Sequence, residues 1–436
     1  MIKIYRLMML LALSAPAVAV SCSKDPGKEQ TDDKTTDTGD TPSGPQNPGD
    51  ASIINIKAGE DLQAALDGAA VGTIVRVQGG VTFKGQFKMR DGVQLSGGWD
   101  AAFTKADPDD NKTVLDGNNA GRVLDQNKDF ENLTVVSGFE IKNGAEENGA
   151  GVYIKKNGII EKCYIHDNTA TSGGGGIRIN AGGICRDCEI SQNTSNNNGG
   201  GAYVYGTMEN CEVTFNKADN NCGGGAQLHD AGTISGCTFA RNSASNGAGI
   251  RVYGNGGVIA NCLIAANTKS DKGTGKLAGT GLTTNGNCTI INCTIVANQG
   301  SDDASTGNAP GLYVGNGGSD SPIYNCIVWG NKYNGGLVTG RQVKGTRVGL
   351  VNNAIAGGDE TDPDVIVLSY DETDAEDAVN PMFVSVKNNV FRLKAGSPLV
   401  DKGLSDVVLA FPKDLDGEAR ISGQRVDLGC FELQQQ

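Results

Sequence analysis

The sequence lacks several features that define common classes of protein. It has no excess of positive charge: 37 Lys and Arg against 50 Asp and Glu give a net charge of −13, which argues against a nucleic-acid partner. It has no apolar run long enough to span a bilayer. Its 64 Gly follow no three-residue period, so the chain is not collagen-like. Helical patterns are few, so the glycines predict a fold with many tight turns.

The N-terminus has the pattern of an export signal. Lys3 and Arg6 precede an apolar run, residues 7–20, and small residues lead to Cys22. The alternative is a plain secretory signal followed by a chance cysteine. The placement of Cys22 resembles the lipobox of bacterial lipoproteins, which implies a signal peptide at 1–21 and acylation of Cys22. We therefore expect a lipid-anchored outer-membrane protein, exposed at the cell surface; whether it faces outward or the periplasm stays open.

A polar segment follows the lipid site. Residues 23–50 are rich in Pro, Gly, Thr and Asp and contain no aliphatic side chain, so they cannot bury apolar surface. We expect residues 22–50 to form a disordered tether, with a root-mean-square span of roughly 30 Å.

The body of the chain repeats itself. Seven segments such as CTFARNSA share an apolar residue three before a Cys, another two after it, and an Asn five after it. The cysteines are Cys163, Cys188, Cys211, Cys237, Cys262, Cys293 and Cys326, at steps of 25, 23, 26, 25, 31 and 33 residues. The asparagines are Asn168, Asn193, Asn216, Asn242, Asn267, Asn298 and Asn331.

A Gly-led strip such as GGGIRIN alternates with these segments. Its apolar residues recur every second position, as at Ile177 and Ile179, which indicates a strand with one face inward. Each repeat should hold about three short strands and corners, and stacked repeats should bury one apolar column. The prediction is an all-β, right-handed parallel β-helix whose coils lie about 4.8 Å apart. The repeated Asn should form a side-chain ladder at left-handed turns.

The ends of the body should be capped. Residues 60–70 place Leu62 and Leu66 at helical spacing, which predicts a short helix over the N-terminal end. Strands are expected at residues 73–77, 93–96, 114–116, 133–141 and 365–368. The expected domains are a β-helix over 51–375 and a C-terminal cap over 376–436.

The signatures GGGA and CTFARNSA resemble repeats of polymorphic outer membrane proteins, within the pectate-lyase-like superfamily of β-helices. The stretch from NPMFVSVKNNVFRL to VDLGCFE is similar to the choice-of-anchor Q region that closes such surface proteins. The resemblance implies the fold and a surface location. It implies no particular reaction, because β-helices carry many functions.

The 12 Cys suggest disulfides at first. Stacked side chains in one inward column point in parallel directions, however, whereas a disulfide needs facing geometry. We predict a buried ladder of free thiols, with Cys185 replacing an Ile in a second inward column. No paired Cys or His motif indicates a metal site.

The outward positions of the Gly-led strands form the candidate binding face. They carry Tyr and Arg, which offer ring faces and bidentate carboxylate contacts suited to acidic sugars. The alternative is an aromatic ladder that stabilises an exposed sheet. The first column is Tyr153, Arg178, Tyr203, Gln227, Arg251, Thr283, Tyr313 and Val338, and the second is Lys155, Asn180, Tyr205, His229, Tyr253 and Asn285. The predicted ligand-binding residues are Tyr153, Arg178, Tyr203, Tyr205, His229, Arg251, Tyr253 and Tyr313.

We expect a monomeric glycan-binding surface protein rather than an enzyme. One alternative is a polysaccharide lyase or related carbohydrate-active enzyme. The candidates for its catalytic base and for the cation that neutralises the substrate carboxylate are Tyr205, His229, Tyr253, Arg178 and Arg251. The other is a structural or adhesive rod. Two long loops, residues 268–280 and 299–310, are further candidates for a site edge. No cofactor is expected; Ca²⁺ stays an alternative, but Asp107–Asp110 and Asp414–Asp416 are interpreted as loop turns.

Overall fold

The computed structural model describes residues 52–270, 279–300, 309–315, 321–333, 336–337, 342–345, 349–358, 362–369 and 379–434. The expected signal peptide, Cys22 and the tether lie outside these residues, as does the boundary expected between residues 375 and 376. The chain divides into two units, and the second, Asp50–Gln436, is described below.

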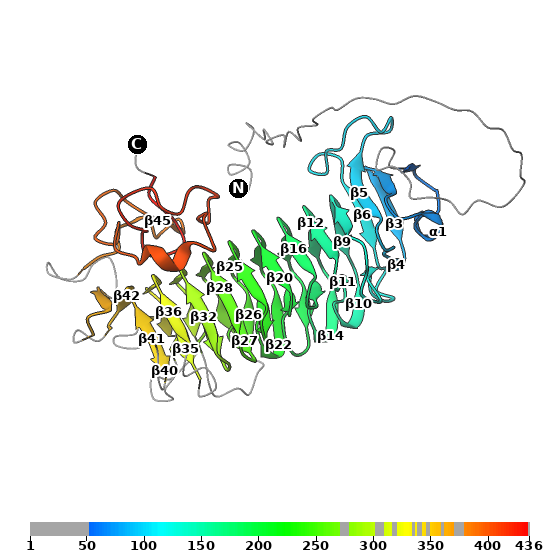
Figure 1. Cartoon of the computed structure of the whole chain (residues 1–436). Coiled ribbons are helices and arrows are strands. Elements are labelled where there is room, and N and C mark those ends of the chain that lie inside the picture. The colour runs from blue at the N-terminus through cyan, green and yellow to red at the C-terminus, as the bar shows by residue number, and fades with distance from the viewer. Residues whose placement is uncertain are drawn as a thin grey trace, which may run out of the picture. The chain divides into compact units, whose positions relative to one another are not determined.

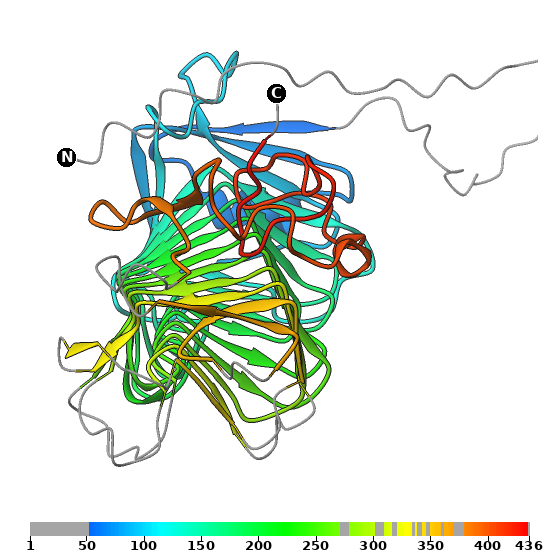
Figure 2. The same cartoon turned by 90° about the vertical axis from the view of Figure 1, so that its left-hand side faces the viewer.

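The second unit is a right-handed parallel β-helix, as predicted. Each coil from β8–β11 to β32–β35 gives one strand to each of four sheets, and strands of successive coils pair in parallel. Figure 1 shows the coils stacked in chain order, and Figure 2 looks onto the C-terminal end of the stack. In chain order, one coil passes through sheet A, sheet B, sheet D and sheet C.

The strand bounds follow the sheets. Sheet A contains β1 (Ile53–Ile56), β2 (Ile74–Gln78), β5 (Gln94–Trp99), β8 (Thr134–Ser137), β12 (Gly158–Glu161), β16 (Ile184–Arg186), β20 (Thr207–Glu209), β24 (Thr233–Ser235), β28 (Gly257–Ala260), β32 (Cys288–Ile291), β36 (Pro322–Tyr324) and β41 (Gly349–Val351). Sheet B contains β3 (Val81–Lys84), β6 (Thr113–Asp116), β9 (Phe139–Lys142), β13 (Tyr164–His166), β17 (Glu189–Ser191), β21 (Glu212–Thr214), β25 (Thr238–Ala240), β29 (Leu263–Ala265), β33 (Thr294–Val296), β37 (Ile327–Trp329), β42 (Asn353–Ala356) and β43 (Val365–Leu368).

Sheets C and D complete the coils. Sheet C contains β4 (Phe87–Lys88), β7 (Leu124–Asp125), β11 (Val152–Ile154), β15 (Ile177–Ile179), β19 (Ala202–Val204), β23 (Ala226–His229), β27 (Ile250–Tyr253), β31 (Leu282–Thr284), β35 (Leu312–Val314) and β40 (Val343–Gly345). Sheet D contains β10 (Ala145–Asn148), β14 (Thr169–Gly173), β18 (Thr194–Ser195), β22 (Lys217–Cys222), β26 (Ser243–Asn246), β30 (Thr268–Lys269), β34 (Gln299–Gly300), β38 (Lys332–Tyr333) and β39 (Gly336–Leu337).

Sheet D corrects the expectation of about three strands per coil. Its strands follow the ladder Asn, and their inward positions hold small residues such as Ala170, Ser195 and Ala218, all buried. Small side chains suffice there because the strands are short and lie at a corner of the coil. The long loops expected after Asn267 and Asn298 begin as β30 and β34, and residues 271–278 and 301–308 lie outside the described part.

The corners of the coil are formed by left-handed residues. The residue before each ladder cysteine has φ between +49° and +59°, at Lys162, Asp187, Asn210, Gly236, Asn261, Asn292 and Asn325. The residue before each ladder asparagine is also left-handed, at Asp167, Gln192, Phe215, Arg241, Ala266, Ala297 and Gly330. The ladder Asn is therefore not itself the left-handed residue, which corrects the prediction.

The Asn ladder forms through hydrogen bonds between coils. Asn193 Nδ2 donates to Asn216 Oδ1 at 3.0 Å and to the Ile165 carbonyl at 2.9 Å. The same contacts recur from Asn168 to Asn331, and these side chains are buried. The amides satisfy backbone groups that the corner removes from the sheets.

The thiol ladder is confirmed in the described residues. Their 11 cysteines are free and buried. The inward column continues as one core from Ile56 to Val328. Cys185 Sγ lies 3.9 Å from Cys211 Sγ, well beyond a disulfide bond length of about 2.0 Å.

A helix covers the N-terminal end, whereas the expected C-terminal cap lies on the side of the stack. Helix α1 (Leu62–Gly68), capped by Asp61, buries Leu62 and Leu66 against the first coil, as predicted. Residues 379–434 contain an antiparallel hairpin, β44 (Phe383–Ser385) and β45 (Val390–Leu393), and a 3₁₀ helix (Ser405–Val408). This C-terminal segment packs on the outward faces of the last coils (Figure 1). No helix in the described residues is long and apolar enough to cross a membrane.

Candidate functional site

The outward face of sheet C carries the predicted strip of Tyr and Arg. In each strand the flanking aliphatic residues, such as Val152 and Ile154, are buried in the core, so the residue between them points outward. Register places Tyr153 beside Arg178, and Arg178 beside Tyr203. The column continues through Gln227, Arg251, Thr283 and Tyr313, as predicted.

The last member of this column was predicted wrongly. Val338 was assigned to the position after Tyr313, but Lys344 of β40 takes it. The strand before Val338, β39, instead pairs antiparallel with β38 in sheet D. Val338 itself lies outside the described residues. A Gly-led strip therefore does not always enter sheet C, because the chain between coils can fold back into a hairpin first.

Tyr153 is surrounded by cations. The charged groups of Arg122, Lys155 and Arg178 lie 4.7, 5.3 and 5.7 Å from its ring centroid. Its hydroxyl accepts a hydrogen bond from Asn180 Nδ2 at 3.0 Å. These cations occupy the surroundings of the ring, so Tyr153 positions basic groups rather than offering a free face for stacking.

Four rings cluster in the middle of the strip. The ring centroid of His229 lies 4.5 Å from that of Tyr203, 4.6 Å from Tyr205 and 5.3 Å from Tyr253. Tyr205 and His229 are stacked on each other. Tyr253 is 53% exposed, whereas His229 is 5% exposed, so Tyr253 is the ring that solvent and ligands can reach.

His229 is a poor candidate for a catalytic base. Its Nε2 lies 2.6 Å from Gln227 Nε2, so the imidazole nitrogen accepts the amide proton. Burial lowers the pKa of His229 to about 4, and the imidazole is neutral near pH 7. Burial also raises the pKa of Tyr203 to about 12. Both shifts favour uncharged rings in this cluster.

The two arginines of the strip, Arg178 and Arg251, differ in the side chains that they contact. Arg178 donates from Nε to Asn180 Oδ1 at 3.1 Å and from Nη1 to Asn148 Oδ1 at 3.0 Å. Arg251 lies 5.6 Å from the ring centroid of Tyr253 and has no carboxylate partner among the described residues. The guanidinium of Arg251 is thus the cation that remains for a ligand anion beside the exposed ring.

The strip ends beyond Arg251. Thr283 is fully buried, and its hydroxyl donates to the Gly279 carbonyl at 2.9 Å. Tyr313 is one coil further on, so the structure does not bring it to the ring cluster. The two long loops, residues 268–280 and 299–310, carry several charged residues. Lys269 lies in β30, and Asp271, Lys272, Asp302 and Asp303 lie outside the described residues.

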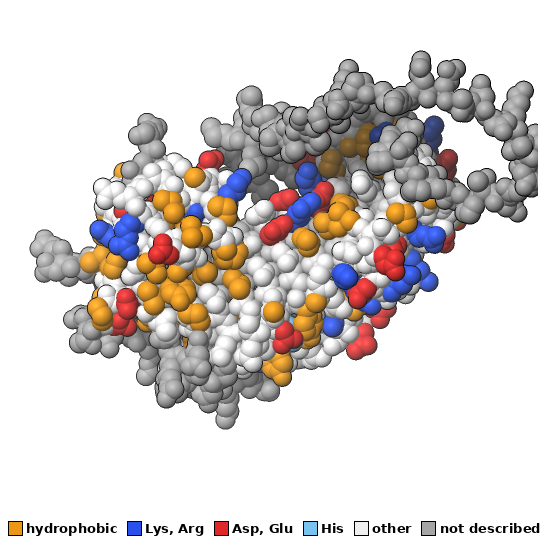
Figure 3. All heavy atoms as spheres, in the orientation of Figure 1, with side chains coloured by type: hydrophobic (Ala, Val, Ile, Leu, Met, Phe, Trp, Pro, Cys, Tyr) orange, Lys and Arg blue, Asp and Glu red, His pale blue; other side chains and the backbone are white. Residues whose placement is uncertain are grey.

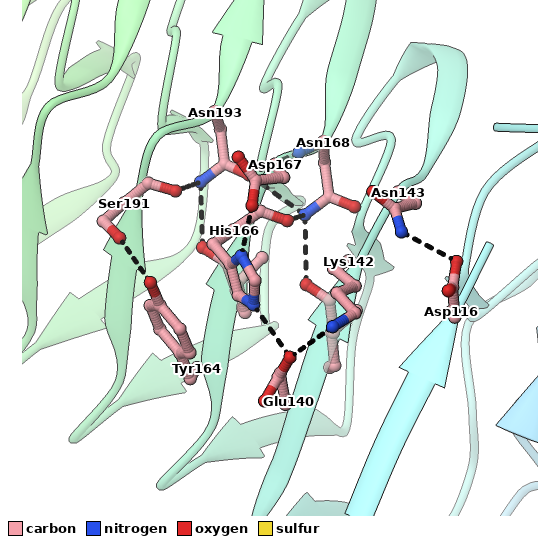
Figure 4. A network of polar contacts seen from close by, with 12 residues as sticks. Asp116, Glu140, Lys142, Asn143, Tyr164, His166, Asp167, Asn168, Ser191 and Asn193 are labelled. Atoms are coloured by element: carbon pink, nitrogen blue, oxygen red, sulfur yellow. Dashed lines mark hydrogen bonds and ion pairs between the residues drawn. The ribbon is translucent and has the colours of Figure 1, made fainter. Parts of the chain in front are cut away.

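A second polar cluster lies on the outward face of sheet B, and the sequence analysis missed it (Figure 4). His166 Nδ1 lies 2.7 Å from Asp167 Oδ2, and its Nε2 lies 3.2 Å from Glu140 Oε1. Glu140 also pairs with Lys142 at 2.7 Å, and the Tyr164 ring stacks on His166. The signal available in the sequence was the alternation around buried Ile165, which places Tyr164 and His166 on the outward face of β13.

The cluster on sheet B is compact and charged. Burial alone would raise the pKa of Glu140, but the hydrogen bond and attraction of Lys142, together with His166, bring it below the ordinary value. Glu140 lies in β9 and His166 in β13, so the contact between them joins neighbouring coils.

No metal site appears in the residues that the structure describes: no three His, Cys, Asp or Glu side chains are grouped to hold an ion. Asp107 pairs with Lys105 at 2.8 Å. Asp414 accepts from the backbone N–H groups of Asp416 and Glu418, so both acidic runs are loop turns, as interpreted.

The comparison with known protein families agrees with the fold. Residues 175–355 match the family model described as a right handed beta helix region. The solved structure of the pectate lyase Pel9A is 14% identical, with a TM-score of 0.48 over 88% of this chain and 97% of that one. An alginate lyase from Paenibacillus sp. str. FPU-7 is also 14% identical, with a TM-score of 0.22 over 68% and 99%. No curated protein sequence matches the chain. Because both TM-scores are below 0.5, neither structural likeness carries a conclusion about this chain.

Proposed function

We propose that this protein binds an acidic glycan on the outward face of sheet C, around Tyr253 and Arg251. The observation that carries the proposal is an exposed ring beside a guanidinium that has no carboxylate partner in the described residues, on a chain of net charge −13. A sugar ring stacks on an aromatic face, and a guanidinium binds a carboxylate through two parallel hydrogen bonds. Tyr205, His229 and Arg178 support these two residues from the neighbouring strands.

Binding is favoured over elimination chemistry at this face. A lyase needs a base that can reach a sugar carbon, but His229 is buried and its Nε2 is already bonded to Gln227. Attachment to the outer membrane through Cys22 is part of the same proposal and is supported by the sequence pattern; metabolic labelling with palmitate tests it.

The test compares two variants with matched chemistry. Tyr253→Ala/Arg251→Gln removes the exposed ring and its cation from sheet C. Phe215→Ala/Arg241→Gln removes a similar pair elsewhere, since Phe215 is 51% exposed and the Arg241 guanidinium lies 5.4 Å from its ring centroid.

On arrays of acidic and neutral polysaccharides we expect the wild type to bind acidic chains. The first variant should bind at least about tenfold more weakly, and the second should bind as the wild type does. The proposal fails if no glycan binds or if both variants bind equally. Release of unsaturated uronides, measured by absorbance, would identify a lyase instead.

A further inference from the structure

A cavity lies at the N-terminal end of sheet C, away from the ring cluster around His229. Its volume is about 440 Å³, and it lies where α1, β4 and the loop after β7 meet. Val71, Met89 and Phe130 give it an apolar part, and Met89 and Phe130 are buried. Basic side chains gather over β4 in Figure 3.

The walls of this cavity are tied together by hydrogen bonds. Gln63 Oε1 of α1 accepts from the Lys88 backbone N–H at 2.8 Å, which joins the helix to β4. Lys88 is the outward residue of β4 and pairs with Asp125, so it lies at the head of the column that contains Tyr153. Helix, strand and loop therefore hold a fixed arrangement around the cavity.

Three cations line the cavity, and two carboxylates accompany them. Lys88 and Arg90 come from β4 and the residues after it, and Lys128 comes from the loop after β7. All three are exposed and make no ion pair with a carboxylate in the described part of the chain.

The two acids are already engaged with the protein. Asp91 accepts from the backbone N–H groups of Glu131 and Asn132, at 3.2 and 2.8 Å. Asp67 Oδ1 accepts from Gln63 Nε2 at 2.8 Å. The lining thus leaves one positive charge in excess, from three cations and two anions, in a chain whose net charge is −13.

We propose that this cavity binds a tetrahedral oxyanion, a phosphate or sulfate group carried by a small ligand. A carboxylate needs only one bidentate arginine, whereas three cations from separate segments suit an anion with three peripheral oxygens. The apolar part formed by Val71, Met89 and Phe130 accommodates the carbon portion of the ligand. This site is distinct from the glycan face proposed above and does not depend on it.

Calorimetric titration of the full chain with inorganic phosphate, at constant ionic strength, tests the proposal. Lys88→Gln/Arg90→Gln/Lys128→Gln should weaken binding at least about tenfold. Lys57→Gln/Lys156→Gln/Lys387→Gln removes three exposed lysines outside the cavity and should change the affinity less than about twofold. Val71→Trp keeps every charge, fills the cavity at a 63%-exposed position, and should also weaken binding.

Two further probes distinguish the source of the group. Tighter binding of glucose 6-phosphate than of phosphate assigns a sugar phosphate. The ligand is a lipid headgroup if the protein binds vesicles that contain phosphatidylglycerol but not vesicles of phosphatidylcholine alone, and if the triple cavity variant no longer binds the former. The proposal is overturned if phosphate does not bind, or if the cavity variant binds it as the wild type does. Neither outcome bears on glycan binding at Tyr253.

Discussion

At the scale of single residues, two successive residues have different roles at each corner of the coil. The backbone turns at a left-handed residue, and its identity varies from Asp167 to Phe215 to Ala266 because most of its side chain faces solvent. The next residue is always Asn, because its amide must both donate and accept within the core. Asn216, for example, donates to the Ile190 carbonyl and Asn242 Oδ1 and accepts twice from Asn193.

Asn216→Ala should therefore destabilise the protein by about 3 kcal/mol or more, because it removes four bonds and leaves buried groups without partners. Asn220→Ala is the control, since Asn220 is exposed and its side chain makes no hydrogen bond within the described residues; its effect should stay within about 0.5 kcal/mol. Urea denaturation followed by circular dichroism measures both. Equal midpoints for the two variants would contradict a structural role for the ladder.

At the scale of elements, what the sequence could predict depends on how strongly each element repeats. Strands of sheets A, B and C were predictable because apolar residues alternate at fixed distances from a Cys. The expected strand at 133–141 proved to be two, β8 and β9, since Gly138 turns between them with φ +79°. Sheet D was missed because its strands, of two to six residues, bury only small side chains such as those of Ala170, Ser195 and Cys222. In the candidate site the columns were predictable, but the cations around Tyr153 depend on side-chain packing between coils.

The C-terminal segment is an element whose burial brings acids together. It covers apolar outward residues of the last coils, such as Val296, Ile327 and Trp329. Within it, the buried Arg420 guanidinium lies among Asp414, Asp427 and Glu432, whose carboxylates accept backbone N–H groups. Burial raises the pKa of all three acids and brings that of Glu432 to about 7.

This segment should lose stability as the pH rises. A carboxyl whose folded pKa exceeds its unfolded value adds stability that is complete below pH 4.5 and is lost as the pH approaches 7. For Glu432 the loss is on the order of 3 kcal/mol. The protection factors of amides in residues 379–434, which compare the observed exchange rate with the intrinsic rate at the same pH, should be larger at pH 5 than at pH 8. Glu432→Gln, which cannot ionise, should reduce that difference; an unchanged difference would show that another group controls it.

At the scale of the whole molecule, one core runs through the stack without interruption. Its inward columns combine aliphatic residues with the cysteines from Cys163 to Cys326. Each coil buries its apolar face only against the coils beside it, so stability is shared between neighbours. The thiols act in this core as small apolar side chains, and their spacing follows the repeat rather than any pairing for disulfides.

The native protein should therefore keep its cysteines reduced and unreactive. Exposure of the 11 described thiols is at most 4%, so a reagent in solvent cannot reach them, and burial also raises the pKa of Cys288 and Cys430 to about 12. Iodoacetamide should label none of them in the folded protein and all of them once urea unfolds it without reductant, as counted by mass spectrometry. Intact disulfides between ladder cysteines in the unreduced, unfolded chain would contradict the thiol ladder. Rapid labelling of the folded protein would instead show that coils open locally and expose the core.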